Sequence, residues 1–239
     1  MRRLISLTIL LFAVVAVPFA GAQNPDIFVT PIPDNPFTGM VNVERSFVQK
    51  DGTVLKSRTA REIGRDSRGR IFNEMRSLVA ANGNDVPQPT GMHIYDPETR
   101  VSTVLSNHDH TFRTGTVNHP PAAVPPSFLT AHSGVNSLPQ NQFSKEEDLG
   151  NKVMDGLTVH GVRQTQTIPN ENGGKGVVIV DEYWYSEDLR INLAITHNDP
   201  RKGGVTMTVS GVNRAEPDPA RFEVPQGFNP AGASQDVKR

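Results

Sequence analysis

The chain contains no cysteine among its 239 residues, and this absence excludes several kinds of stabilisation and chemistry. Disulfide bonds cannot staple the fold, so the core alone must hold an exported form of the protein together. A cysteine nucleophile is excluded, and so is a lipid anchor on a cysteine at a signal-peptide cleavage site. The sequence also lacks the Gly-x-Ser-x-Gly turn of serine hydrolases and the His-Glu-x-x-His zinc motif. These absences remove the best-defined catalytic motifs.

An excess of either charge is also absent. The chain has 24 Lys and Arg residues against 25 Asp and Glu residues, for a net charge of −1. Domains that bind nucleic acid are usually strongly basic, so the composition gives no support for a nucleic-acid partner. Long apolar runs are absent beyond the N-terminus, and we therefore expect no membrane span after residue 22.

The first 22 residues have the pattern of a signal peptide. A pair of arginines precedes an apolar run over residues 4–20, and Ala20-Gly21-Ala22 supplies the small residues that a signal peptidase requires. The sequence therefore predicts export, to the periplasm or the extracellular medium, with Gln23 as the first mature residue. An uncleaved membrane anchor is the alternative, although the run is shorter than the roughly 20 apolar residues of a spanning helix.

Most of the remaining chain has the period-two pattern of half-buried strands. Val41, Val43 and Phe47 alternate with polar residues, and Asp51-Gly52 then provides a tight hairpin turn. Residues 23–37 instead carry four prolines and predict an extended N-terminal tether. Further strands are expected at 54–63, 70–79, 92–95, 101–105, 152–158, 159–168, 177–185, 191–196 and 205–210.

Two regions interrupt this pattern and no region shows a long helical period. Residues 114–145 contain five prolines between positions 120 and 139 and predict a long irregular loop. Glu216-Pro217-Asp218-Pro219 predicts one helical turn, and residues 229–239 predict a disordered tail. We therefore expect a single, mainly β domain over residues 38–228, a large antiparallel meander with little helix. Such a sheet must curl into an open half-barrel or fold into two layers to hide its apolar face.

The few aromatic residues suggest a ligand site. Tyr183 and Tyr185 flank Trp184, the single tryptophan of the chain. Because aromatic rings bury a large area, we expect Trp184 and Tyr183 to line the concave side of the curled sheet, with Arg163 at its rim. For Trp184 the pattern favours a core anchor over a ligand platform, since it shares a strand face with Val178 and Val180. No cofactor is expected.

His108-Asp109-His110 is the one cluster that suggests a metal. On a strand, His108 and His110 would share a face while Asp109 would point away. Their spacing does not match established zinc motifs, so we assign no metal site and keep the two histidines as weak candidates. A metal-dependent hydrolase that uses them is an alternative function.

Several short motifs follow one another in a characteristic order over residues 60–228. They are Arg65-Asp66-Ser67-Arg68-Gly69-Arg70, Glu147-Asp148-Leu149-Gly150, Gly161-Val162-Arg163-Gln164-Thr165 with Thr167-Ile168-Pro169, Glu182-Tyr183-Trp184-Tyr185-Ser186, Asp199-Pro200-Arg201 and Glu216-Pro217-Asp218-Pro219. In this order they resemble an uncharacterised family of exported bacterial β-sheet proteins, a resemblance that implies no activity.

A more distant resemblance concerns the fold. The closing Phe-x-x-Pro-x-Gly-Phe pattern over residues 222–228 and the expected curl are similar to the half-barrels of lipoprotein carriers (LolA/LolB-like). This resemblance implies an open sheet that holds an apolar cargo. The chain departs from those carriers because it lacks a helix that would plug the barrel.

The sequence therefore predicts an exported, non-catalytic β domain that binds an apolar ligand, such as a lipid, or an envelope protein. Besides the hydrolase, a purely structural envelope protein is an alternative, which the proline-rich residues 23–37 suggest. The sequence leaves open the identity of the ligand or partner and the oligomeric state.

Cleavage of the signal peptide is directly testable. We expect the exported protein to begin at Gln23, because the small residues at positions 20 and 22 satisfy the peptidase. Mass spectrometry of the N-terminal peptide from the purified protein checks this. A protein that retains residues 1–22 would support the membrane-anchor alternative instead.

Overall fold

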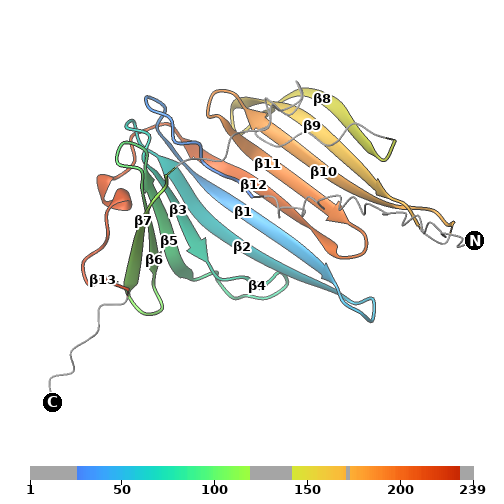
Figure 1. Ribbon diagram of the computed structural model, residues 1–239, viewed down its shortest axis with the longest axis horizontal. Helices are drawn as coiled ribbons and strands as arrows, with labels where there is room; N and C mark the ends of the chain where they lie inside the picture. The colour runs from blue at the N-terminus through green and yellow to red at the C-terminus, as the bar shows by residue number, and fades with distance from the viewer. Residues whose placement is uncertain (1–25, 119–141, 171–172, 232–239) are drawn as a thin grey trace, which may run out of the picture.

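The computed structural model describes residues 26–118, 142–170 and 173–231, which form one curled sheet (Figure 1). The strands are β1 (Phe37–Val48), β2 (Val54–Arg65), β3 (Ile71–Arg76), β4 (Val79–Ala80), β5 (Pro89–Asp96), β6 (Val101–Ser106), β7 (Thr111–Thr116), β8 (Ser144–Met154), β9 (Leu157–Ile168), β10 (Val177–Ser186), β11 (Ile191–Asp199), β12 (Gly203–Asn213) and β13 (Asn229–Pro230). One 3-10 helix, η1 (Pro219–Phe222), precedes β13. In these ranges no helix has the length and apolar character needed to cross a membrane.

The sheet is continuous, and it remains open. Its strands follow the order β13-β7-β6-β5-β3-β2-β1-β12-β11-β10-β9-β8, with the short β4 paired to β2. All pairs are antiparallel except β13 with β7. The expected mainly β meander is confirmed, and of the two expected shapes the protein adopts the open half-barrel.

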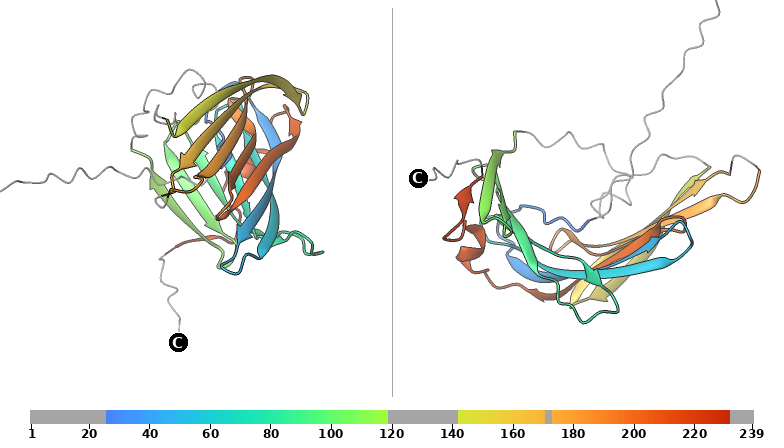
Figure 2. Two further views of the ribbon diagram at one scale, coloured as in Figure 1. Left: turned by 90° about the vertical axis from the view of Figure 1, so that its right-hand side faces the viewer. Right: turned by 90° about the horizontal axis from the view of Figure 1, so that it is seen from below.

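The curl gives the sheet two different faces (Figure 2). Residues 26–36 lie in the hollow of the sheet, and we call this side the inner face. The C-terminal segment 214–231 runs along the opposite side, the outer face. Each end of the described chain therefore covers part of one face.

The alternation of side chains along β1 explains the inner face. Val41 and Val43 are buried, and they lie opposite Val209 and Met207 of β12, which are buried as well. The residues between them point to the outer face, where Asn42 is exposed and lies opposite Thr208. One face is therefore apolar and the other polar, as a half-solvated antiparallel sheet requires.

The core has two parts. The larger lies under residues 26–36, whose Ile27 and Val29 are buried against the sheet. The smaller lies on the outer face, where Phe222 of η1 packs edge-on against Phe72 with ring centroids 5.5 Å apart. The expected helical turn is confirmed: Asp218 caps η1 by accepting a hydrogen bond from the backbone N–H of Ala220 at 3.0 Å.

A buried arginine fixes the N-terminal segment in the hollow. The side chain of Arg65, at the end of β2, has no exposed area. It donates hydrogen bonds to the backbone carbonyls of Asn35 at 2.8 Å, Thr30 at 2.6 Å and Leu189 at 3.0 Å. Burial, together with the nearby cations Arg214 and Arg190, lowers the pKa of Arg65 to about 10. One guanidinium thus joins three segments that are far apart in sequence.

The turn after Arg65 extends this junction. Asp66 accepts hydrogen bonds from the backbone N–H groups of Arg68 and Arg70, which close the turn between β2 and β3. Gly69 has a φ of +82° and lies so close to the backbone of Ile32 that a Cβ there would be 3.0 Å from its carbonyl carbon. The family-like motif over residues 65–70 is therefore a structural joint.

Some segments differ from the expectations. The end of β7 and the start of β8 lie within the region expected as a loop at 114–145. The sequence pattern does not predict them because these two segments carry few apolar residues. Residues 119–141 of that loop, the expected signal peptide and the tail beyond residue 231 lie outside the described residues. Asn229 and Pro230, assigned to the tail, instead pair with β7. Val178, in the strand expected at 177–185, is 39% exposed.

The junction at Arg65 makes a stability prediction. Replacing Arg65 with methionine leaves one buried and two part-buried backbone carbonyls without their donor, so we expect a loss of about 3 kcal/mol of the free energy of unfolding. Urea denaturation followed by circular dichroism measures this. Arg68 is the matched control because its side chain is 58% exposed, and R68M should change stability by less than about 0.5 kcal/mol. Equal losses in both variants would contradict the clamp.

Candidate ligand-binding face

The structure separates the three residues expected to form one site. Tyr183 lies on the inner face, opposite Val162 of β9, and is 8% exposed. Trp184 is the next residue of β10 and points to the outer face, where its ring covers Gly161. Arg163 shares the outer face with Trp184. Only Tyr183 therefore faces the hollow, since neighbouring residues of a strand point in opposite directions.

Arg163 and Trp184 each have close partners on the outer face. Arg163 pairs with Glu182 at 2.7 Å and with Glu147 at 3.6 Å, and the Glu182 carboxylate raises the pKa of Arg163. The ammonium of Lys152 lies 3.4 Å from the centroid of the Trp184 ring. These contacts join β8, β9 and β10. Binding of a ligand by Arg163 or Trp184 remains a prediction, and it would concern a different face from that of Tyr183.

The two candidate metal ligands lie in a turn rather than on a strand. His108 and His110 belong to the connection between β6 and β7, and His110 has a φ of +51°. The ring of His110 packs edge-on against Phe228 at a centroid distance of 5.4 Å. Across the described ranges, no three His, Cys, Asp or Glu residues are grouped so as to hold a metal ion. The hydrolase alternative therefore gains no support from the geometry.

A row of polar side chains crosses the inner face between the core and the hairpin at residues 49–53. The register places Ser57 of β2, Arg45 of β1, Val205 of β12, His197 of β11 and Asp181 of β10 side by side. At one end of the row, the ring Nδ1 of His197 lies 2.6 Å from a carboxylate oxygen of Asp181. Val205 is the one apolar member of the row. It lies between the pair of His197 and Asp181 on one side and Arg45 with Ser57 on the other.

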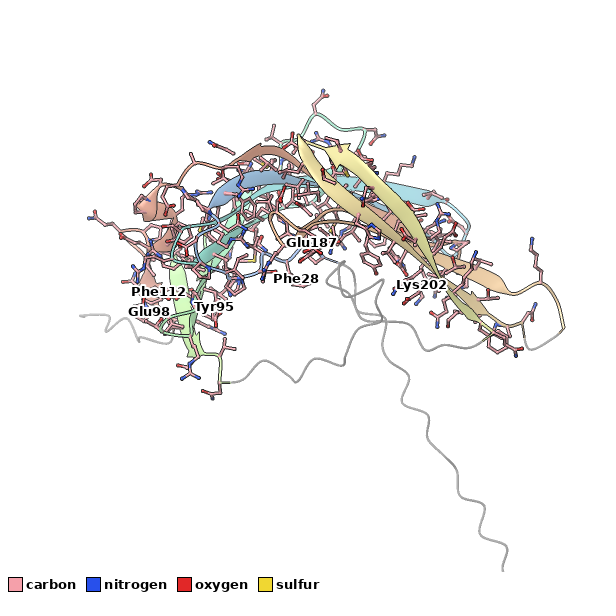
Figure 3. The ribbon with its side chains drawn as sticks, turned by 90° about the horizontal axis from the view of Figure 1, so that it is seen from above. Phe28, Tyr95, Glu98, Phe112, Glu187 and Lys202 are labelled. Atoms are coloured by element: carbon pink, nitrogen blue, oxygen red, sulfur yellow. The ribbon has the colours of Figure 1, made fainter. Side chains whose placement is uncertain are left out.

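Exposed apolar side chains lie next to this row. Phe47 and Leu55 are cross-strand neighbours on the inner face, 48% and 51% exposed. Phe28 of the N-terminal segment is 72% exposed and points into the hollow, while its neighbours Ile27 and Val29 face the core (Figure 3). Further inner-face residues, Met75 and Val104, are also partly exposed. The hollow thus presents apolar surface that the chain's described residues leave uncovered.

The sequence contains one local signal for this site, which is a charged residue at an apolar position of a strand. Arg45 falls in the apolar phase of β1, two residues after Val43 and two before Phe47. In a strand, this spacing places a charge on the buried face. Leu55 follows by the same parity once the Asp51-Gly52 hairpin sets the register. His197 and Asp181 require the pairing of β10 with β11 and could not be joined from one strand.

A depression of about 360 Å³ lies beside the same strands. Four members of the polar row, Ser57, Arg45, Val205 and His197, contribute to its lining. The other lining residues are Glu44, Ser46, Lys56, Ala81, Thr196, Asn198, Gly204 and Thr206.

Comparison with known proteins gives matches of fold only. No protein-family model matches the sequence, and no curated protein matches it. The solved structure of MucB matches with 12% identity over 82% of this chain and a TM-score of 0.40, and the chain spans 59% of the length of MucB. The lipoprotein LppX of Mycobacterium tuberculosis matches with 10% identity over 75% of this chain and 88% of that chain, with a TM-score of 0.31.

A putative outer membrane lipoprotein-sorting protein domain from Vibrio parahaemolyticus matches with 10% identity over 78% of this chain and 89% of that chain. Its TM-score is 0.18. The structural neighbours thus include lipoprotein-related proteins, in keeping with the resemblance found in the sequence. Because these TM-scores lie below 0.5, we base the function on this chain's own side chains.

The pair of His197 and Asp181 makes a pH prediction. The hydrogen bond to Asp181 raises the pKa of His197 above 6.5, Asp199 raises it further, and burial and Lys202 oppose this. A raised pKa stabilises the fold fully below about pH 6.5, and this contribution is lost as the pH rises through the folded-state pKa. We therefore expect the stability difference between the native protein and H197Q to shrink with rising pH.

Urea denaturation at a series of pH values measures this difference. Burial lowers the pKa of His93, so the contribution of His93 to stability changes with pH in the opposite direction. The native protein and H197Q must therefore be compared at each pH. H93Q is the control variant, and replacing His197 in it should cause the same pH-dependent loss of stability. A difference that stays constant or grows with pH would contradict the assignment.

Proposed function

We propose that this protein is an exported, non-catalytic binding protein whose curled sheet holds an apolar or amphipathic ligand at the cell envelope. The single observation that carries the proposal is the exposed apolar pair Phe47 and Leu55 on the inner face. Contiguous apolar surface on a soluble protein usually marks an interaction site, since exposure to water is unfavourable. The concave shape supports a ligand rather than a flat partner surface.

The N-terminal segment supports the same proposal from a second direction. Phe28 adds a further exposed aromatic ring above the sheet, and Ile27 and Val29 anchor the segment that carries it. Phe28 therefore adds exposed apolar surface on the concave side of the sheet. The signal-peptide pattern of residues 1–22 supports export, which brings the protein to the compartment where such ligands must cross water.

Two neighbouring residues provide a matched test of the face involved. Leu55 is 51% exposed on the inner face, and Val54 is 49% exposed on the outer face. We expect L55D to weaken binding of the neutral probe N-phenyl-1-naphthylamine by about tenfold, because a carboxylate removes apolar contact and resists desolvation. V54D should leave binding unchanged. Fluorescence titration of each protein, purified without detergent, gives the affinities.

The outcomes separate clearly. Loss of binding in L55D alone supports the inner face as the site. Equal loss in both variants points to a general effect of the hairpin charge and contradicts this location. If the native protein does not bind the neutral probe at all, the proposed function itself is wrong.

A further inference from the structure

Three buried polar groups on the inner face have no hydrogen-bond partner within the described ranges. They are Nε of Arg45, Oγ of Ser57 and Oγ1 of Thr59. Arg45 and Ser57 lie directly opposite each other across β1 and β2, and Thr59 is the next residue of β2 on the same face. Buried polar groups are nearly always hydrogen-bonded, so three orphans at one place require an explanation.

The three groups share a chemical property: each can donate a hydrogen bond. A guanidinium is always charged and only donates, and the hydroxyls of serine and threonine donate readily. Neighbouring donors of this kind suit an oxygen anion, which has several acceptor positions. A carboxylate or phosphate group satisfies them better than water does, because its hydrogen bonds to a guanidinium are charge-assisted.

The electrostatics around Arg45 also favour an anion. No acidic side chain forms an ion pair with Arg45 in the described part of the chain, whereas neighbouring Arg61 pairs with Asp26. Arg45 is close enough to Arg61 to lower the pKa of Arg61, although burial is the larger cause. Lys202 lies at the same rim, beside the Gly203 that pairs with Phe47 (Figure 3). Arg45 is therefore a cation on the inner face without an acidic partner among the described residues.

Apolar surface adjoins the same place. Phe47 is the next residue of β1 on the inner face after Arg45, and Leu55 is the corresponding neighbour of Ser57 on β2. A cationic group and an exposed apolar pair are therefore one strand step apart, at about 7 Å along each strand. This separation matches the junction between the headgroup and the hydrocarbon chain of an amphiphile.

We propose that the ligand is an amphiphile with an anionic oxygen headgroup, that Arg45 with Ser57 and Thr59 binds this headgroup, and that its hydrocarbon chain lies on Phe47 and Leu55. This inference rests on the proposed function and names the chemical class of its ligand. It adds a binding residue, Arg45, and a direction along the inner face: the headgroup toward the core and the chain toward the hairpin at 49–53.

Oleate and oleyl alcohol test the headgroup, because they share one hydrocarbon chain and differ in charge. Each competes with N-phenyl-1-naphthylamine on the protein purified without detergent. We expect oleate to bind about tenfold more tightly than the alcohol, as a charge-assisted contact implies. R45Q should reduce this ratio to near one, and R45K should give an intermediate ratio, since it keeps the charge without the fork of donors.

Lys56 supplies the control. It precedes Ser57 on β2 and points to the outer face, so K56Q removes the same charge from the other side of the sheet. K56Q should keep the full oleate preference. Circular dichroism checks that each variant is folded. Should R45Q fail to fold, R45K and the loss of oleate preference at high ionic strength provide the same test.

The outcomes distinguish this inference from the proposed function. Native protein that binds the neutral probe but takes oleate and oleyl alcohol equally overturns the anionic headgroup and leaves the apolar site intact. An equal effect of K56Q and R45Q also overturns the role of Arg45. Displacement of oleate by inorganic phosphate alone would identify a small-anion site instead. Absence of any probe binding would overturn the proposed function itself.

Discussion

The hydrogen bonds of Arg65 are the constraint on which the rest of the structure depends. A buried guanidinium is costly unless its donors are satisfied, and here backbone carbonyls from residues 30, 35 and 189 satisfy them. These bonds hold residues 26–36 against the upper part of the inner face. Ile27 and Val29 then complete the core, and the lower part of the face stays open. The position of the clamp therefore leaves uncovered the part of the inner face where we propose that a ligand binds.

The same arrangement explains how a sheet of this size is stable when its described residues include one short helix. A sheet needs both faces covered where they are apolar, and helices usually provide the cover. In this chain the N-terminal segment covers the inner face, and the C-terminal segment with Phe222 covers the outer face near β3. The two sheet edges are also protected against pairing with another chain. β13 pairs with β7 at one edge, and β8 at the other edge contains several charged residues.

Much of the fold is predictable from the sequence because the determining signals are local. Alternating side chains identify most strands, Asp51-Gly52 identifies a hairpin, and the proline-rich segment before Phe222 identifies the helical turn. The alternation of side chains does not predict β7 or the start of β8, because these segments contain few apolar residues. The pairing of β1 with β12 connects residues about 160 positions apart, and no local pattern specifies it. The clamp at Arg65 is long-range in the same sense.

The candidate site shows the same division between local and long-range information. Period two already forbids Tyr183 and Trp184 from sharing a face, and it places Arg45 on the apolar one. The remaining information is in the cross-strand row. Toward β10 its polar groups are paired, as His197 and Asp181 show, whereas Arg45 and Ser57 at the other end are not.

That asymmetry within one row is informative. Sequences usually satisfy local rules throughout a fold, and positions that break one without compensation tend to be functional. If the row had only a structural role, each of its polar side chains would be expected to have a hydrogen-bond partner. If the ligand were purely apolar, polar side chains would not be expected at these positions. Unpaired donors beside exposed apolar side chains are instead what an amphiphile with an anionic headgroup requires. The contrast between the two ends of the row thus supports the proposed placement of the headgroup at the β1–β2 end.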